Sequence, residues 1–144
     1  MLFRDIVLIM ILCTICYTDV KRMEIDNEPI LIGLAFIIPY SIAGLNNIST
    51  ISSVYGFFLG GAIFAVLTFF GMGGGDVKLM AMLGFFLGWQ QILYVTFLSF
   101  IIGSVLGIIY ILIFKRSFKD YIPFGPSIAI AAMITIFFGG MPWI

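Results

Sequence analysis

Two aspartates, Asp19 and Asp76, are the residues best suited to chemistry in this chain of 144 residues. Each adjoins a long apolar run, where an acidic side chain is costly and by default points to a function. Two carboxylates brought together share one proton, because the first negative charge opposes the second ionisation. One can then act as a base on a water while the other, protonated, donates to a carbonyl oxygen, which is the chemistry of an aspartic protease.

The composition excludes most other catalytic chemistries. The chain contains no histidine, so Ser-His-Asp and Cys-His arrangements and His-containing zinc sites cannot be built. Cys13 and Cys16 form a CxxC inside an apolar run, whereas a zinc ribbon needs a second pair and a solvated loop, so we expect buried, inert thiols. We therefore predict no metal and no cofactor. Seven basic residues balance seven acidic ones, which argues against binding to nucleic acid.

The same composition identifies a membrane protein. Hydrophobic residues make up 62% of the chain and charged residues 10%. A spanning helix needs about 20 residues, so six of them would leave no room for a second domain. We predict one polytopic domain over residues 1–144, an all-α bundle of six transmembrane helices in the lipid bilayer. The first is a retained helix and not a signal peptide, because Asp5 cancels Arg4 and no A-x-A site follows.

Six apolar runs supply these helices. They extend from about Arg4 to Arg22, Ile30 to Leu45, Val54 to Phe70, Val77 to Gly88, Ile92 to Phe114 and Ile128 to Phe138, with Trp89 to Gln91 as interface residues between the fourth and the fifth. In the third run, Gly56 and Gly60 form a Gly-x-x-x-Gly pattern that lets helices approach closely, which would also allow a homo-oligomer.

The short fourth run decides the topology. If it crosses the membrane, the connections after the first, third and fifth runs share one side. Six of the seven basic residues then lie on that side, namely Lys21, Arg22, Lys78, Lys115, Arg116 and Lys119. The positive-inside rule makes that side cytoplasmic and places both termini on the outer face. Two full crossings separate Asp19 from Asp76, so both lie at the cytoplasmic face.

These features alone leave several functions open. A small proton- or cation-coupled transporter could use the same aspartates, and the pentapeptide GFFLG, at 56–60 and 84–88, would suit an inverted repeat. Five residues of a common membrane composition are weak evidence for one. In a purely structural interpretation, Asp76 is the N-cap of the fourth helix and Asp19 is an interface residue.

Three motifs resemble those of the type IV prepilin peptidases, membrane aspartic proteases that remove leader peptides from prepilins. Gly73-Gly74-Gly75-Asp76 resembles their Gly-x-Gly-Asp motif. Asp19 lies seven residues before Asp26, as the first aspartate of the family lies seven residues before a proline, and Asn27 then matches in register. The segment 123–126, Pro-Phe-Gly-Pro, resembles the opening of the family's last helix.

The resemblance implies a membrane-embedded aspartic endopeptidase with Asp19 and Asp76 as its catalytic pair. Its substrates would be prepilin-like or preflagellin proteins with a short basic leader, cut at the cytoplasmic boundary of a prokaryotic cell membrane. The chain has no room for the paired-CxxC, N-methylating part of larger members, so we expect a peptidase-only form similar to tight-adherence or archaeal preflagellin peptidases. A silent assembly subunit, which would bind prepilin without cutting it, is a further alternative.

Overall fold

The computed structural model describes residues 3–22, 25–46, 48–114 and 124–138, and these contain helices and no strand. The helices are α1 (Phe3–Arg22), α2 (Asn27–Ile42), α3 (Thr50–Thr68), α4 (Gly74–Phe114) and α5 (Gly125–Phe138). The predicted all-α class is confirmed.

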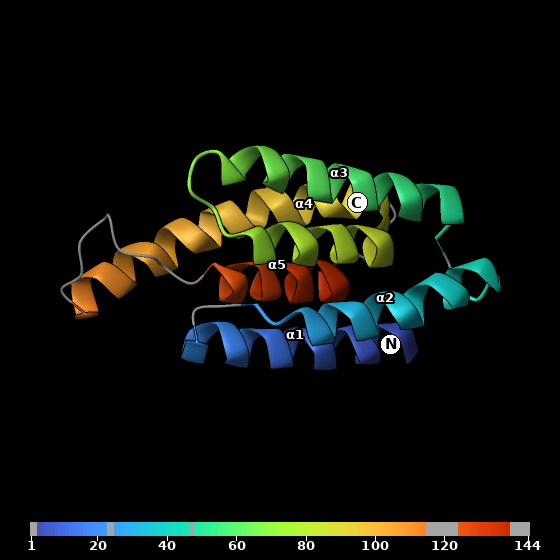
Figure 1. Cartoon of the computed structure of the whole chain (residues 1–144), viewed down its shortest axis with the longest axis horizontal. Coiled ribbons are helices and arrows are strands. Elements are labelled where there is room, and N and C mark those ends of the chain that lie inside the picture. The colour runs from blue at the N-terminus through green and yellow to red at the C-terminus, as the bar shows by residue number, and fades with distance from the viewer. Residues whose placement is uncertain (1–2, 23–24, 47, 115–123, 139–144) are drawn as a thin grey trace.

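Helix α4 consists of two helical segments joined at Gly88. This residue has non-helical backbone angles, φ 82° and ψ 171°, in the positive-φ region that glycine tolerates best. Figure 1 shows that the chain reverses its direction there, so the two segments run antiparallel. The first segment packs beside α3.

The helices alternate in direction, which gives the bundle two distinct ends (Figure 1). At one end α1 and α3 finish while α2, α4 and α5 begin; we call this the Asp76 end. At the other end α1 begins and α4 reverses; we call this the Arg4 end. Asp19 and Asp76 therefore share one end, as counting the crossings predicted.

The first segment of α4 forms the centre of the bundle. Most of its side chains are buried, among them the fully buried Leu79, Met80, Met82, Leu83 and Phe86. Helix α1, which packs against α5 and α2, carries a stripe of buried residues at helical spacing, Leu8, Leu12, Ile15 and Asp19. The last residue of this stripe is Asp19, so the same helical spacing that buries the apolar side chains of α1 also buries its carboxylate.

Close backbone packing joins α3 to α4. A Cβ at Gly56 or Gly84 would collide with the other residue's carbonyl oxygen, and one at Gly60 would collide with Met80. Both copies of GFFLG thus meet in this contact. The Gly-x-x-x-Gly face is used inside the chain, where small residues let two helix backbones approach.

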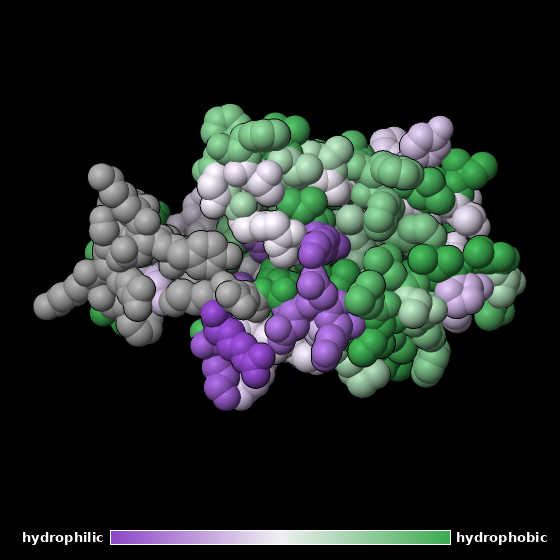
Figure 2. All heavy atoms as spheres, in the orientation of Figure 1, coloured by the Kyte–Doolittle hydropathy of each residue, from purple (hydrophilic) through white to green (hydrophobic). Residues whose placement is uncertain are grey.

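The outer surface is largely apolar. Large hydrophobic side chains such as Phe58, Phe69 and Leu112 are exposed. In Figure 2 the most hydrophilic side chains gather near the end of α1 and the start of α2, while most of the remaining visible face is apolar. By length and composition, α3 and residues 74–113 of α4 could each cross a membrane, and α2 and α5 are shorter apolar helices. This surface fits a lipid environment.

Several predicted boundaries and one burial were wrong. Helix α3 begins at Thr50, before the predicted Val54, because Ser49 caps it by accepting a 3.2 Å hydrogen bond from the Ser52 N–H. The second segment of α4 already includes Trp89 to Gln91, before the predicted Ile92, since the reversal needs only Gly88; that these residues lie at a membrane interface stays a prediction. Cys13 is exposed and not buried, because it lies off the inward stripe of α1.

Candidate active site

The two predicted site residues meet at the Asp76 end of the bundle. Asp19 in the last turn of α1 is 1% exposed, and Asp76 in the first turn of α4 is 2% exposed. Although 57 positions separate them in the chain, their charges are close enough to interact electrostatically. The fold therefore assembles a buried pair of carboxylates from two helices.

Asp76 is held by the turn that begins α4. The helix begins at Gly74, so Asp76 is its third residue and not the N-cap that the sequence suggested. Its N–H donates to the Gly73 carbonyl oxygen at 3.2 Å, and its carboxylate accepts a hydrogen bond from the Gly73 backbone. The third helical side chain thus reaches back toward the residue before the helix, as in one half of a capping box; the other half cannot form, because Gly73 has no side chain.

Gly75 lets this turn approach the connection between α1 and α2. A Cβ at position 75 would lie 2.8 Å from the Cβ of Ile25, closer than side chains tolerate. Position 75, just before Asp76, therefore needs a glycine so that the start of α4 can pack against the connection that follows Asp19.

Asp19 is held by the first residue of α5. The Gly125 N–H donates to Asp19 Oδ2 at 2.8 Å, across 106 positions of sequence. The other carboxylate oxygen, Oδ1, is buried and accepts no hydrogen bond from the residues that the structure describes. Sequence reasoning treated the Pro-Phe-Gly-Pro segment as a rigid helix start and missed this contact. The signal was the glycine inside that motif; Pro123 lies outside the described residues.

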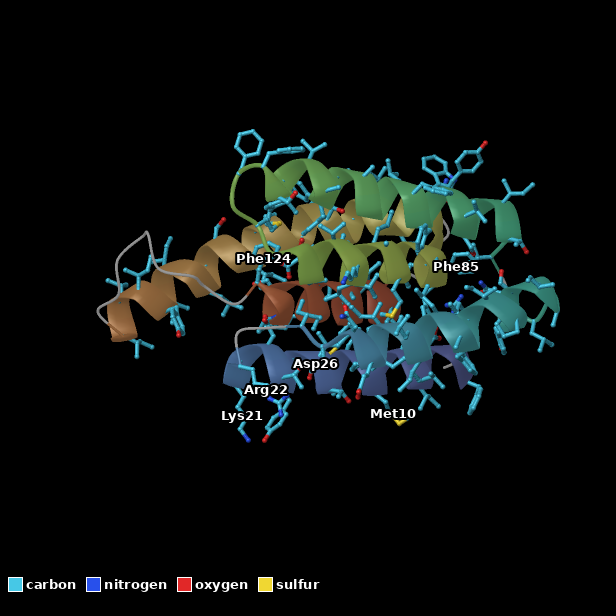
Figure 3. The ribbon with its side chains drawn as sticks, in the orientation of Figure 1. Met10, Lys21, Arg22, Asp26, Phe85 and Phe124 are labelled. Atoms are coloured by element: carbon cyan, nitrogen blue, oxygen red, sulfur yellow. The ribbon has the colours of Figure 1, made fainter. Side chains whose placement is uncertain are left out.

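Asp26 stands where the resembled motif has a proline, and its backbone suits that position. Its φ is −64° and its ψ 139°, just before α2 begins. A proline fixes φ near −65°, so the backbone at Asp26 has a conformation that a proline could also adopt. The Asp26 carboxylate instead lies 3.8 Å from the guanidinium of Arg22, and Figure 3 shows both side chains at this end of the bundle.

Lys78 faces away from the aspartate pair. Its ammonium donates to Asn27 Oδ1 at 2.8 Å, which links α4 to α2. Both residues line an apolar groove of about 670 Å³ between α2, α3 and α4, and neither aspartate lines it. With Lys21 and Arg22, Lys78 places three basic residues at the Asp76 end; Lys115, Arg116 and Lys119 lie outside the described part of the chain.

Comparison with known proteins points to one family. The model of the type IV leader peptidase family matches residues 6–112. The prepilin leader peptidase/N-methyltransferase of Bacillus subtilis (strain 168) is 34% identical over 145 residues, which cover 96% of this chain and 56% of that protein.

Proteins of the same name from two other bacteria match a shorter stretch. That of Aeromonas salmonicida (strain A449) is 46% identical over 69 residues, 48% of this chain and 24% of that protein. That of Legionella pneumophila is 41% identical over 68 residues, 47% of this chain and 24% of that protein. The matches thus span about half of the Bacillus protein and a quarter of the other two. No solved structure matches the chain.

Proposed function

Because the chain belongs to the type IV leader peptidase family, we propose that it is a membrane-embedded aspartic endopeptidase that removes the leader peptide of prepilin-like or preflagellin proteins. The single observation that carries this proposal is the pair of buried carboxylates, Asp19 and Asp76. They interact with each other, and no lysine or arginine in the described ranges forms an ion pair with either.

The pair supplies the groups that peptide hydrolysis needs. One carboxylate removes a proton from a water while the water oxygen bonds to the carbonyl carbon of the scissile peptide. The other carboxyl group donates a hydrogen bond to the carbonyl oxygen as negative charge develops there. Collapse of the intermediate breaks the C–N bond, and the leaving nitrogen takes up a proton. Because the two sites are coupled, the rate should follow a bell-shaped pH profile whose apparent pKa values belong to the pair.

The topology that suits this activity has six crossings, both termini on the outer face and the Asp76 end at the cytoplasmic face. Its support is the six helical segments among the described residues, which alternate in direction (Figure 1), and the basic residues at the Asp76 end, which the positive-inside rule assigns to the cytoplasm. A substrate with a basic cytoplasmic leader and a membrane-embedded helix would present its cleavage site at that level. Any homo-oligomer would need a face other than Gly56 and Gly60, which pack within the chain.

The test is cleavage by the purified chain in liposomes that contain a prepilin-like substrate, with the substrate mass as readout. We expect Asp19→Asn and Asp76→Asn each to lower the cleavage rate by ~10³-fold or more, because an amide cannot exchange the proton. The matched control is Asp26→Asn, an acidic residue at the same end that lies outside the pair, and we expect it to keep cleavage.

Two outcomes would contradict the proposal. Cleavage that depends on only one aspartate would exclude a pair mechanism. A well-inserted protein that cleaves none of several leaders would exclude the peptidase; proton-coupled flux in the same vesicles would then favour the transporter that the sequence left open.

A further inference from the structure

An aromatic cluster fixes the residue that precedes α5. The ring of Phe124 packs against both Phe64 of α3 and Phe100 of α4, with centroid distances of 6.2 Å and 5.8 Å, and these two rings also stack on each other. It also lies against Gly103, where any Cβ would collide with the ring. Figure 3 shows Phe124 at the start of α5. Two helices that carry neither Asp19 nor the connection after it therefore anchor this residue.

The next residue, Gly125, contacts the carboxylate of Asp19, so the packing of Phe124 also positions Asp19. The Gly125 N–H belongs to the first turn of α5, where backbone amides lack helical partners and favour a negative charge. It donates to Asp19 Oδ2 at 2.8 Å. A Cβ at position 125 would lie 2.5 Å from Oδ2 and 3.0 Å from Cγ of Asp19. Any side chain at 125 would therefore displace the carboxylate.

We propose that Phe124 and Gly125 are positioning residues for Asp19, and that Oδ1 is the atom through which Asp19 exchanges a proton in the reaction. The Gly125 amide occupies Oδ2, whereas Oδ1 is buried and has no hydrogen-bond partner in the described ranges. A buried carboxylate oxygen without a partner is costly, and a role in proton transfer accounts for that cost. The inference rests on the proposed peptidase function, which supplies the water and the peptide.

The contact can be tested without any assay of activity. Gly125→Ala should lower the melting temperature of the detergent-solubilised protein clearly in the native background. In an Asp19→Ala background, Gly125→Ala should lower the melting temperature much less, because the Asp19 Oδ2 and Cγ atoms that the new methyl group would meet are absent. Equal losses in both backgrounds would overturn the contact that the proposal requires.

The positioning role is tested by kinetics on correctly inserted protein. Gly125→Ala should lower kcat by ~10–10²-fold with KM unchanged, because a small displacement of a reacting group is that costly. Gly125→Val should lower kcat further, and Phe124→Leu should cause a smaller loss of the same kind. The matched control is Gly74→Ala, at the variable position of Gly-x-Gly-Asp, where a Cβ meets nothing within 4 Å.

The outcomes separate this inference from the proposed function. A native kcat in folded Gly125→Ala, or an effect confined to KM, would overturn the positioning role. Failure of the unaltered protein to cleave would instead count against the peptidase, and the melting-temperature comparison would still decide whether Gly125 holds Asp19.

Discussion

The two ends of the bundle bury acidic residues in opposite ways. At the Arg4 end, Arg4 and Asp5 are each 8% exposed, and the Arg4 Nε and Nη2 donate to Asp5 Oδ1 at 3.0 Å and 2.8 Å. The Arg4 Nη1 donates to Asn46 at 2.6 Å. At the Asp76 end, Asp19 and Asp76 are more deeply buried but have each other as electrostatic neighbours, while Lys21 and Arg22 are exposed.

This difference distinguishes a buried ion pair that stabilises the fold from a buried pair of acids that is suited to catalysis. A buried ion pair that shares hydrogen bonds is tolerable, and removal of one partner is strongly destabilising. Two neighbouring carboxylates repel when both are ionised, so stability alone does not favour them. At the Arg4 end, the ion pair of Arg4 with Asp5 and the hydrogen bond to Asn46 link α1 to the connection between α2 and α3. At the Asp76 end, two carboxylates that form no ion pair with a cation in the described ranges are suited to proton transfer.

The strongest test of this comparison replaces one acid at each end by its amide. Asp5→Asn should lower the free energy of unfolding by about 3 kcal/mol, because it removes the anionic partner of the buried Arg4. Asp19→Asn should leave it unchanged or raise it, because it removes the repulsion from Asp76. Equilibrium unfolding by SDS in mixed micelles measures both variants on one scale.

The control for this pair removes both charges at the Arg4 end. Arg4→Leu together with Asp5→Leu should cost much less than Asp5→Asn alone, because both members of the ion pair are replaced together by apolar side chains. If Asp5→Asn and Asp19→Asn changed the stability equally, the two ends would not differ in the way that their contacts indicate.

A second prediction concerns the glycine contact between α3 and α4, which involves none of the charged residues at either end. Gly84→Ala should destabilise the protein by about 2 kcal/mol, because its methyl group would overlap the backbone of Gly56 and force α3 away from α4. The matched control is Gly61→Ala, whose Cβ would lie 3.3 Å from that of Ala81 and needs only a slight shift. Equal effects would mean that the close glycine contact does not hold the two helices together.

The sequence predicted the parts of the site that depend on local pattern. Apolar runs located the helical segments, and Gly88 ends the fourth run where the structure reverses. Counting the crossings placed Asp19 and Asp76 at one end, because an even number of crossings returns the chain to the end from which it started, whatever the packing. Helix starts were less accurate where a single side chain decides them, as Ser49 does for α3.

The contact between Gly125 and Asp19 could not be predicted in this way. It joins residues 106 positions apart, and its geometry depends on how Phe124 packs against two other helices. Which face of α1 turns inward is likewise a tertiary outcome, and this is why Cys13 was misplaced. No local pattern specifies that one carboxylate oxygen of Asp19 is bonded to Gly125 and that the other has no partner among the described residues.

The smallest effects are expected at one polar contact from each end. In each contact a basic side chain donates a hydrogen bond to an asparagine, Arg4 to Asn46 and Lys78 to Asn27. Asn46→Ala removes a partner of the buried Arg4 and should cost about 1.5 kcal/mol. Lys78→Met removes the contact with Asn27, but both residues are exposed, so water replaces it and the loss should stay below about 0.5 kcal/mol. The pH profile of cleavage should not move in Lys78→Met, since Lys78 faces α2 and the groove. A shifted profile would show that Lys78 tunes the aspartate pair, and the Asp76 end would then have a matching cation after all.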